Sequence, residues 1–544
     1  MRQLITSVMC FVAVTVWSQS NLITLDLQEA SAQEAMAQVM AQTNYQFAYN
    51  PDVLKDDPIT LSLNQVQIDK ALDKLFAQNY QVKVRGSYVV LLPRKQEESA
   101  PKKNSIQIKG AVLEASTNRQ LEDVTIYEVQ TLKPVFTDAS GNYSLEIELP
   151  DEVAFIAISK EHYQDTVIQV KRNEFWKISL RRKDKAPKAK EEKVDKVQQK
   201  FLSDKISMHA KNVNLTERRF FQLALTPGLS TNGFLSGQFT NKVSINMIAG
   251  YSHAVEGAEF GGALNMSRSY VQGVQMSGGV NINGELTNGV QFAGISNITL
   301  ADLKGWQAAG FSNQVDQASA VQMAGGMNFS KNMKGVQIAG MSNWNQYEYH
   351  GVQISGGLNY TRKLKGIQIG VVNVADSVAG GMMLGVVNWA KNGFHVLEFS
   401  SNDVAPYNLA FKSGVEAFYT ILRAGINPHD NQLWDYGMGI GTLARWKEKT
   451  FIDLEATYHV IQPLDQRFID GVNVSTRVQM RFGYRLANKI QLIGGPVLHF
   501  LFFKPKNIED LSFADRFGRS TLSSTQTNSF SRKWWLGYAF AVRF

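Results

Sequence analysis

Cysteine is almost absent from this chain of 544 residues, and the single one, Cys10, lies in a mostly apolar N-terminal run. A basic residue precedes this run, and the segment Val16-Trp17-Ser18 places small residues at the two positions that determine signal-peptide cleavage. We therefore expect residues 1–18 to be a secretory signal peptide. Its removal would leave a mature chain without cysteine, which excludes disulfides, thiolate zinc sites and cysteine nucleophiles.

Long apolar runs are absent too, because no stretch of 18 consecutive apolar residues occurs, so the sequence predicts no transmembrane helix. The net charge of +8 is modest for the length, and the basic residues around 181–193 are interleaved with acidic ones, which indicates a solvated linker and no nucleic-acid partner. The eight histidines form no HExxH motif or close ligand pair. We therefore predict no metal site and no cofactor.

What the sequence does contain is a repeated Gly-x-Gln phrase between about residues 257 and 390, with an asparagine six residues after most of the glutamines. The phrase recurs every 15 or 16 residues. The glutamines are Gln275, Gln291, Gln307, Gln322, Gln337, Gln353 and Gln368. The asparagines are Asn281, Asn297, Asn313, Asn328, Asn343 and Asn359, and Asn373 continues the series.

Within each copy apolar and polar residues alternate, which is typical of a β-strand with one apolar and one polar side. A unit of 15 or 16 residues leaves about nine or ten for a strand and about six for a turn, the length of a transmembrane β-strand. We therefore predict a mainly β protein in which residues 215–544 form a large antiparallel transmembrane β-barrel of roughly 16–20 strands. The repeat glutamines and asparagines are expected to face its lumen.

The alternative interpretation of the repeat is a β-solenoid whose rungs stack the glutamines and asparagines into ladders and bury the Val/Ile/Met face. The later strands favour the barrel. Arg477 and Arg481 alternate with apolar residues, and Asp453 and Glu455 do the same in the preceding strand-like run. Such side chains are expected to form ion pairs in a polar lumen, an explanation that we prefer to a pair of catalytic carboxylates.

The last ten residues place Tyr538, Phe540, Val542 and Phe544 on one side of a strand that ends in an aromatic residue. This pattern is similar to the C-terminal strand by which outer-membrane barrels are recognised for insertion. The resemblance implies two partners, the barrel assembly machinery and outer-membrane lipid.

Residues 22–93 alternate strand and helix patterns, with a Ser-x-x-Glu capping box at Ser31 and a second apolar helix pattern at 68–76. This twice-repeated strand and helix module resembles the short N-terminal (STN) domain shared by secretins and TonB-dependent transducers. The resemblance implies a periplasmic adaptor that contacts a partner protein and carries no catalytic residues.

Residues 105–182 show short alternating strands with frequent turns, which indicate a small β-sandwich. The run Thr137-Asp-Ala-Ser-Gly-Asn-Tyr-Ser-Leu145 resembles the carboxypeptidase regulatory-like family, a non-catalytic accessory domain. Asp138 and Asn142 are expected to form the turn around Gly141 and not to bind calcium. Residues 183–214 are predicted to be a charged flexible linker.

The order of these parts resembles the TonB-dependent receptors of the Bacteroidetes type, but the roughly 30 residues between sandwich and barrel are too few for a plug domain. We therefore predict a non-enzymatic outer-membrane protein with its N-terminal domains in the periplasm, acting as a pore or as a signalling or envelope anchor. The alternative is a cell-surface adhesin or interaction protein that displays a repeat β-solenoid.

Overall fold

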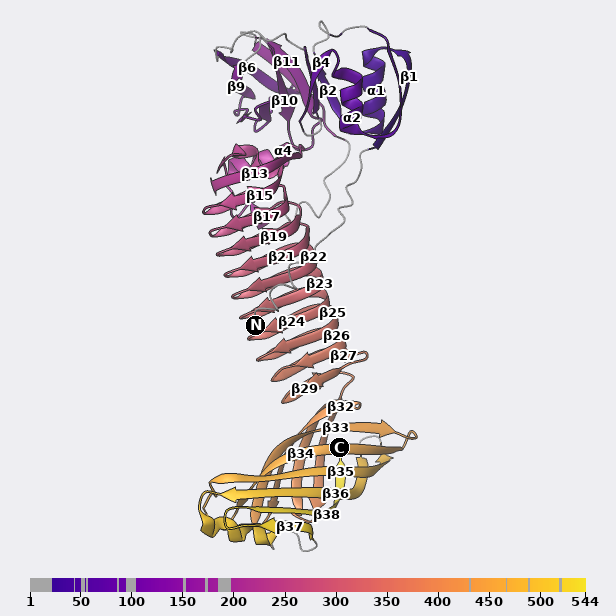
Figure 1. Cartoon of the computed structure of the whole chain (residues 1–544), viewed down its shortest axis with the longest axis vertical. Helices are drawn as coiled ribbons and strands as arrows, with labels where there is room; N and C mark the ends of the chain where they lie inside the picture. Colours follow the sequence, from indigo (N-terminus) through magenta and orange to yellow (C-terminus); the bar gives the residue numbers. More distant parts are fainter. Residues whose placement is uncertain are drawn as a thin grey trace. The chain divides into compact units, whose positions relative to one another are not determined.

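The computed structural model divides into two compact units, Met1–Glu256 and Gly257–Phe544, which are described separately (Figure 1). It describes residues 22–43, 45–49, 54, 57–85, 88–93, 104–149, 153–171, 175–183, 197–429, 432–465, 467–487, 490–517 and 521–544. The predicted signal peptide and residues 184–196 of the predicted linker lie outside the described residues. Within the described part of the chain, no helix has both the length and the hydropathy needed to cross a membrane.

The first unit begins with two small sheets and two helices, in the order that the sequence predicts. The elements are β1 (Leu22–Ala30), α1 (Ala32–Gln42), β2 (Gln46–Tyr49), β3 (Ile59–Gln67), α2 (Ile68–Phe76), β4 (Tyr80–Arg85) and β5 (Tyr88–Pro93). β1 pairs antiparallel with β3, and β5 lies between β2 and β4. The predicted capping box is confirmed, because Glu34 N donates to Ser31 Oγ at 3.2 Å and Ser31 N donates to Glu34 Oε2 at 2.9 Å.

Two further sheets follow, of three and four strands, and a shared apolar core lies between them. One sheet contains β12 (Phe175–Leu180), β6 (Asn104–Glu114) and β9 (Asn142–Leu149); the other contains β11 (Thr166–Lys171), β10 (Val153–Ser159), β7 (Thr125–Glu128) and β8 (Pro134–Phe136). This is a small β-sandwich. Asp138 Oδ1 accepts from Ser140 N at 2.9 Å and from Asn142 N at 2.8 Å, so its carboxylate forms the expected turn.

Helix α4 (Asp204–Asn212) lies inside the segment 183–214, so the prediction of a flexible linker is wrong for these residues. The helix packs on the sandwich through its buried face: His209 Nδ1 lies 3.0 Å from Thr125 Oγ1, and the His209 ring stacks on Phe136 with centroids 3.8 Å apart. Asn212 Nδ2 donates to the Asp123 carbonyl at 2.7 Å. The helix also buries Ile206 and Ala210. A charged segment with few apolar residues gives little sign of these contacts in the sequence.

After α4 the first unit ends in β13 (Glu217–Thr226), β14 (Leu229–Ser230), the 3₁₀ helix η2 (Gly233–Gln238), β15 (Phe239–Asn246) and β16 (Ala249–Ser252). β13 and β15 pair in parallel, as do the strands of the repeat region that follows.

The repeat region folds as a parallel β-solenoid, and this solenoid has about nine turns. Its strands are β17 (Ala254–Gly261), β18 (Leu264–Ser267), β19 (Val271–Ser277), β20 (Val280–Asn283), β21 (Leu286–Ala293), β22 (Ser296–Ala309), β23 (Ser312–Ala324), β24 (Met327–Ala339), β25 (Ser342–Ser355), β26 (Leu358–Ile369), β27 (Val372–Val378), β28 (Met382–Leu384) and β29 (Val387–Ala390). Equivalent residues of successive rungs are paired in register: Gln322 lies beside Gln337, and Gln337 beside Gln353.

The remaining residues form a separate antiparallel sheet, the C-terminal sheet (Figure 1). Its strands are β30 (Phe394–Asn402), β31 (Tyr407–Val415), β32 (Phe418–Asn427), β33 (Leu433–Arg445), β34 (Thr450–Pro463), β35 (Gly471–Ala487), β36 (Ile490–Pro505) and β38 (Ser531–Arg543), with β37 (Thr521–Gln526) beside the start of β38 and the 3₁₀ helix η3 (Ile508–Arg516) before it. β30 also pairs with β38, from Glu398↔Arg543 to Asn402↔Ala539. The ring of eight antiparallel pairings is therefore closed.

The mainly β class is confirmed, but the single barrel of roughly 16–20 strands predicted for residues 215–544 is wrong. Of these residues, 217–390 belong largely to the parallel solenoid, and eight strands remain for the closed antiparallel sheet. The two folds share the features on which the prediction was based. A rung strand and a barrel strand both alternate with period two, and a unit of 15 or 16 residues suits either.

His209 makes the attachment of α4 sensitive to pH. Burial, and to a smaller extent the nearby Lys205, lowers the pKa of His209 to about 3, so the folded unit holds the neutral ring. Below about pH 6.5, the pKa of histidine in the unfolded chain, the unfolded chain binds a proton that the folded chain does not. Each further pH unit of acidification therefore lowers the free energy of unfolding by up to about 1.4 kcal/mol. Hydrogen exchange of residues 204–212, corrected for intrinsic rate, should therefore accelerate between pH 6.5 and pH 4.5.

The His209→Gln variant should lose this pH dependence, because no buried imidazole remains to titrate. His162→Gln, at a histidine whose side chain is 51% exposed, is the matched control and should retain it. An unchanged slope in His209→Gln would contradict the assignment.

Candidate functional site

The repeat glutamines form one continuous ladder inside the solenoid. Gln322 Nε2 donates to Gln307 Oε1 at 2.8 Å, and Gln322 Oε1 accepts from Gln337 Nε2 at 2.8 Å. The same contact links every neighbouring pair from Gln275 to Gln368, and all seven side chains are buried. Each internal amide thus has both a donor and an acceptor partner one rung away.

The repeat asparagines form a second ladder. Asn328 Nδ2 donates to Asn343 Oδ1 at 2.9 Å and also to the Ile338 carbonyl at 2.8 Å. Asparagine amides donate to the following rung, whereas glutamine amides donate to the preceding one, so the two rows of amide dipoles oppose each other. The ladder continues beyond the predicted residues, from Asn265 to Asn388.

The predicted position of these residues is therefore corrected: the repeat glutamines and asparagines lie in the solenoid interior and do not face a barrel lumen. The glycines between them are explained by the same stacking. A Cβ on Gly340, at the corner between Gln337 and Asn343, would lie 2.1 Å from the Gly325 carbonyl oxygen of the rung below. No side chain fits there, so the corner glycine that follows each repeat glutamine is a packing requirement of the rung.

The solenoid alternative was also wrong in one respect, because the Val/Ile/Met side of the rungs is not buried. Side chains that follow the glutamines point outward; Met323 and Phe292 are each 41% exposed and Ile354 is 36% exposed. The apolar part of the interior comes mostly from residues between the copies, together with Ala320 at the start of one copy and Met383, which takes the glutamine position of the last copy. These are Leu303, Val315, Ala318, Ala320, Met333, Tyr349, Leu364, Ala375, Met383 and Ala390.

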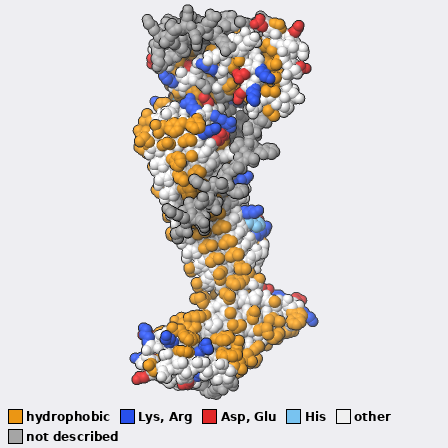
Figure 2. All heavy atoms as spheres, in the orientation of Figure 1, with side chains coloured by type: hydrophobic (Ala, Val, Ile, Leu, Met, Phe, Trp, Pro, Cys, Tyr) orange, Lys and Arg blue, Asp and Glu red, His pale blue; other side chains and the backbone are white. Residues whose placement is uncertain are grey.

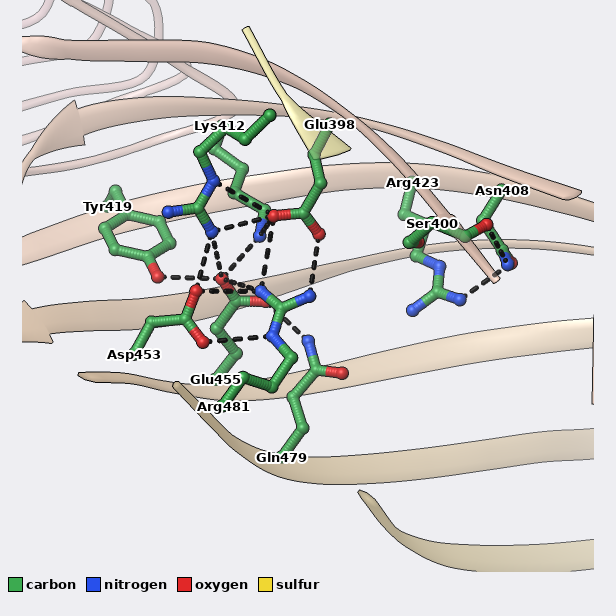
Figure 3. A network of polar contacts seen from close by, with 11 residues as sticks. Glu398, Ser400, Asn408, Lys412, Tyr419, Arg423, Asp453, Glu455, Gln479 and Arg481 are labelled. Atoms are coloured by element: carbon green, nitrogen blue, oxygen red, sulfur yellow. Dashed lines mark hydrogen bonds and ion pairs between the residues drawn. The ribbon is translucent and has the colours of Figure 1, made fainter. Parts of the chain in front are cut away.

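The C-terminal sheet encloses a network of buried charges (Figure 3). Arg481 Nη1 lies 2.8 Å from Glu398 Oε1, and Arg481 Nη2 lies 2.9 Å from Asp453 Oδ2. Lys412 Nζ lies 2.5 Å from a carboxylate oxygen of Glu398 and 2.5 Å from one of Glu455. These groups come from four different strands, β30, β31, β34 and β35, so the network ties opposite parts of the ring together.

The network is electrically balanced. Its three carboxylates, Glu398, Asp453 and Glu455, face three cations, which are Lys412, Arg481 and Arg543. Arg543 lies 2.7 Å from Glu398 and 2.6 Å from Asp453. The carboxylate oxygens lie within 4.8 Å of one another, a spacing that a metal ion could bridge. Because Lys412, Arg481 and Arg543 already contact these oxygens, the donor set fits ion pairing and not a metal.

A second polar group occupies another part of the interior. Arg477 Nη2 lies 2.6 Å from Asp435 Oδ2, so the expected lumen ion pairs exist, although Arg477 pairs with a residue that sequence analysis did not name. His499 Nε2 lies 3.0 Å from Asp403 Oδ1, and Trp535 Nε1 donates to Asp403 Oδ2 at 2.7 Å. Polar side chains thus occupy the inside of the ring at several separate places.

The outer side of the C-terminal sheet is apolar. Tyr538, Phe540 and Phe544 are 56%, 63% and 52% exposed, and Val542, on the same side of β38, is half-buried. The predicted insertion residues therefore share the outward face. Other strands contribute Leu409, Met438, Ile440, Leu454, Met480, Phe482, Leu492 and Phe500, each at least 43% exposed.

Within the second unit the solenoid interior meets the C-terminal sheet through its last rung. Asn388 Nδ2, which ends the asparagine ladder, donates to Thr420 Oγ1 of β32 at 2.7 Å. Trp389 stacks on His395 with ring centroids 4.3 Å apart. The last rung is thus held against the sheet by both polar and aromatic contacts.

Comparison with known proteins gives no relative: no protein-family model matches the chain, and neither the curated proteins nor the solved structures contain a significant match. The resemblances of residues 22–93 and 105–182 to known domains therefore stay predictions.

The amide ladder can be tested with two variants that make the same chemical change. Gln322→Glu replaces an interior donor by a carboxylate beside Gln307 Oε1, which leaves a buried charge without a cation and should destabilise the solenoid by roughly 3–5 kcal/mol. Gln314→Glu makes this change on the exposed side of the same rung and should alter stability by less than about 0.5 kcal/mol. Chemical denaturation of the full chain at pH 7.5 measures both.

Acidification should change the stability of the two variants differently. Protonation of the new carboxyl in Gln322→Glu restores a donor for Gln307 Oε1, so part of the lost stability should return at pH 5, whereas Gln314→Glu should show no such recovery. Equal effects of the two variants would contradict the ladder.

Proposed function

We propose that this protein is a non-enzymatic outer-membrane protein whose C-terminal sheet is its membrane anchor. The observation that carries the proposal is the inverted polarity of that sheet. Arg477, Arg481 and Arg543 are among the largest fully buried side chains, while aromatic and aliphatic residues cover the outside. A water-soluble domain has the opposite distribution, whereas a transmembrane β-barrel has a polar interior and an apolar outer band.

The dimensions of the sheet support the same proposal. Its eight ring strands contain from 9 residues, in β30 and β31, to 17 residues, in β35, and a transmembrane strand needs roughly 9–11. Aromatic residues lie near strand ends, as at Trp446, which is 71% exposed beside the turn between β33 and β34. Such residues suit the membrane interface. The apolar C-terminal strand and the predicted signal peptide agree with this location.

Of the two roles that the sequence left open, anchor and pore, the interior favours the anchor. A ring of about eight strands has an interior just wide enough for side chains to fill. Here the interior holds the Glu398 network and the Arg477–Asp435 pair, both with ion-pair distances below 3 Å. We infer that the sheet does not conduct ions.

In this proposal the solenoid and the N-terminal domains are interaction elements attached to the anchor. The resemblance of residues 22–93 to STN domains supports a periplasmic protein partner for them. The solenoid supports a second candidate, a cell-surface interaction protein, because a repeat of about nine turns offers a long surface for contacts. The two candidates differ in the side of the membrane on which the solenoid lies.

Fractionation and heat-modifiability test the anchor. The protein should be found in the outer-membrane fraction, and the unboiled band should migrate faster than the boiled one because a closed sheet resists detergent. In planar bilayers the purified protein should give no steps of conductance. A soluble protein without a mobility shift would exclude the anchor, and stable conductance would restore the pore.

The buried ion pairs should control how strongly the sheet resists heat. Glu398→Gln removes the carboxylate that contacts Lys412, Arg481 and Arg543 and leaves buried cations undercompensated, at a cost of about 3–5 kcal/mol. The temperature at which the fast-migrating band disappears should therefore fall. Glu416→Gln makes the same change at an exposed pair with Arg445 and should leave that temperature nearly unchanged.

A further inference from the structure

The charges of the solenoid are confined to one side of each rung. In the seven copies that begin at residues 273, 289, 305, 320, 335, 351 and 366, no Asp, Glu, Lys, Arg or His occurs between the first position and the asparagine. All the Asp, Glu, Lys, Arg and His residues between Asn265 and Gly381 lie in the five positions before the next copy. They are Arg268, Glu285, Asp302, Lys304, Asp316, Lys331, Lys334, Glu348, His350, Arg362, Lys363, Lys365 and Asp376.

The charge-free side is covered with exposed apolar residues, and we call it the apolar face. Figure 2 shows hydrophobic side chains gathered along the solenoid. The face contains the outward residues of the Gly-x-Gln strand and those of the glycine corner. Its large members that are at least 36% exposed are Phe260, Met276, Phe292, Ile295, Trp306, Phe311, Met323, Met341, Ile354, Val371, Met382, Leu384 and Val386.

A shallow groove of about 600 Å³ runs along this face. Its apolar walls come from equivalent positions of successive rungs, including Phe260, Met276, Phe292, Met323 and Ile338, and its floor contains corner glycines such as Gly310. Successive rungs lie about 4.8 Å apart, so the groove follows the solenoid axis for roughly 20–25 Å. A water-soluble monomer rarely leaves so continuous an apolar surface exposed.

We propose that the apolar face lies in the hydrocarbon of the same bilayer that holds the C-terminal sheet, with the charged side of the rungs in water. This inference rests on the proposed function and extends it, since it makes the solenoid a second membrane-contacting element. The occupant of the face is the acyl-chain region of the bilayer.

The backbone and the interior of the solenoid suit such an environment. Hydrocarbon penalises unpaired polar groups, and here the strands of neighbouring rungs are paired in register while the side-chain amides pair inside. The Asn328 amide also satisfies the Ile338 carbonyl at the corner. The apolar face therefore offers lipid mainly aliphatic and aromatic surface.

The border between the two sides has the charge expected at a bilayer surface. Lys304 and Lys334 are exposed, lie one position before the first residue of a copy, and point to the same side as the apolar residues two positions later. Lysine stems can lie along hydrocarbon while the ammonium groups contact anionic headgroups. Lys365 occupies the same border position and contacts Glu348 at 2.5 Å. Further from the border, opposite charges are paired, as in Lys331–Asp316 at 2.7 Å.

The solenoid that carries this face is also in contact with the C-terminal sheet, whose outer side the proposed function places in lipid. The last rung contacts β32 through Asn388 and Thr420, and the outer side of the C-terminal sheet is apolar. A protein partner for the face would need its own long, charge-free surface, whereas acyl chains require no specific contacts.

The cysteine-free mature chain allows a direct test by site-specific fluorescence. Single variants Met323→Cys and Met341→Cys place a probe on the apolar face, and Lys334→Cys places one at its charged border. Leu536→Cys, at a residue of the C-terminal sheet that is 60% exposed, reports on the anchor. Each full-length labelled protein is reconstituted in liposomes and quenched separately by doxyl-labelled phospholipid and by aqueous iodide.

The proposal expects probes at Met323, Met341 and Leu536 to be quenched several-fold more by the doxyl lipid than by iodide, and the probe at Lys334 to show the reverse. If only Leu536 is quenched by lipid, the solenoid lies outside the bilayer: the inference is wrong and the anchor stands. If Leu536 is not quenched by lipid either, the anchor itself is wrong. Protection of Met323 and Met341 from both quenchers would assign the face to a second copy or another protein and would also overturn the inference.

Discussion

The amide-to-amide hydrogen bond between successive rungs is the constraint on which the solenoid depends. A buried amide needs a donor and an acceptor, and each repeat glutamine finds both only when the rungs align so that Gln322 lies between Gln307 and Gln337. A slip of one residue would point every amide outward and leave the partners unsatisfied. The length of each unit is therefore fixed by its interior, and the one-residue differences between units are absorbed at the bulges before the next copy, as between Thr299 and Asp302.

Because polar side chains pair inside, the apolar residues of the phrase are left on the outside. The C-terminal sheet has the same distribution, with ion pairs in place of amides. The two elements differ in strand direction and in closure, yet both place backbone and polar groups where water is not required to satisfy them. The anchor and the apolar face share this distribution of polar and apolar groups. The exposed surface of each is unfavourable in water and favourable in hydrocarbon.

Sequence analysis predicted local structure well and the large architecture only in part. The elements of residues 22–93 and the alternation along the repeat follow from capping, turns and periodicity, which are local. The choice between barrel and solenoid is not local, and it was made wrongly for the repeat. A signal was nevertheless present, because the same phrase recurs in every unit. Antiparallel neighbours reverse direction, so identical phrases in successive barrel strands would not place Gln322 beside Gln337; only parallel stacking does so.

The interior partners in the C-terminal sheet show what sequence could not supply. The alternation in β34 and β35 indicated that Asp453 and Arg481 point inward, but pairing with Glu398 depends on the closure of the ring. Glu398 and Arg543 are paired residues of β30 and β38, so they lie on the strands where the ring closes.

That closure is the shortest contact in the ring, with 5 residue pairs between β30 and β38 against 13 between β36 and β38. Few backbone hydrogen bonds hold the two strands together there. Glu398 and Arg543 add a side-chain ion pair of 2.7 Å across the same junction, and Arg481 and Lys412 connect it to strands elsewhere in the ring. The buried ion pairs thus also connect β30 and β38, the two strands whose pairing closes the ring. This contribution to closure accounts for the position of the network at that junction.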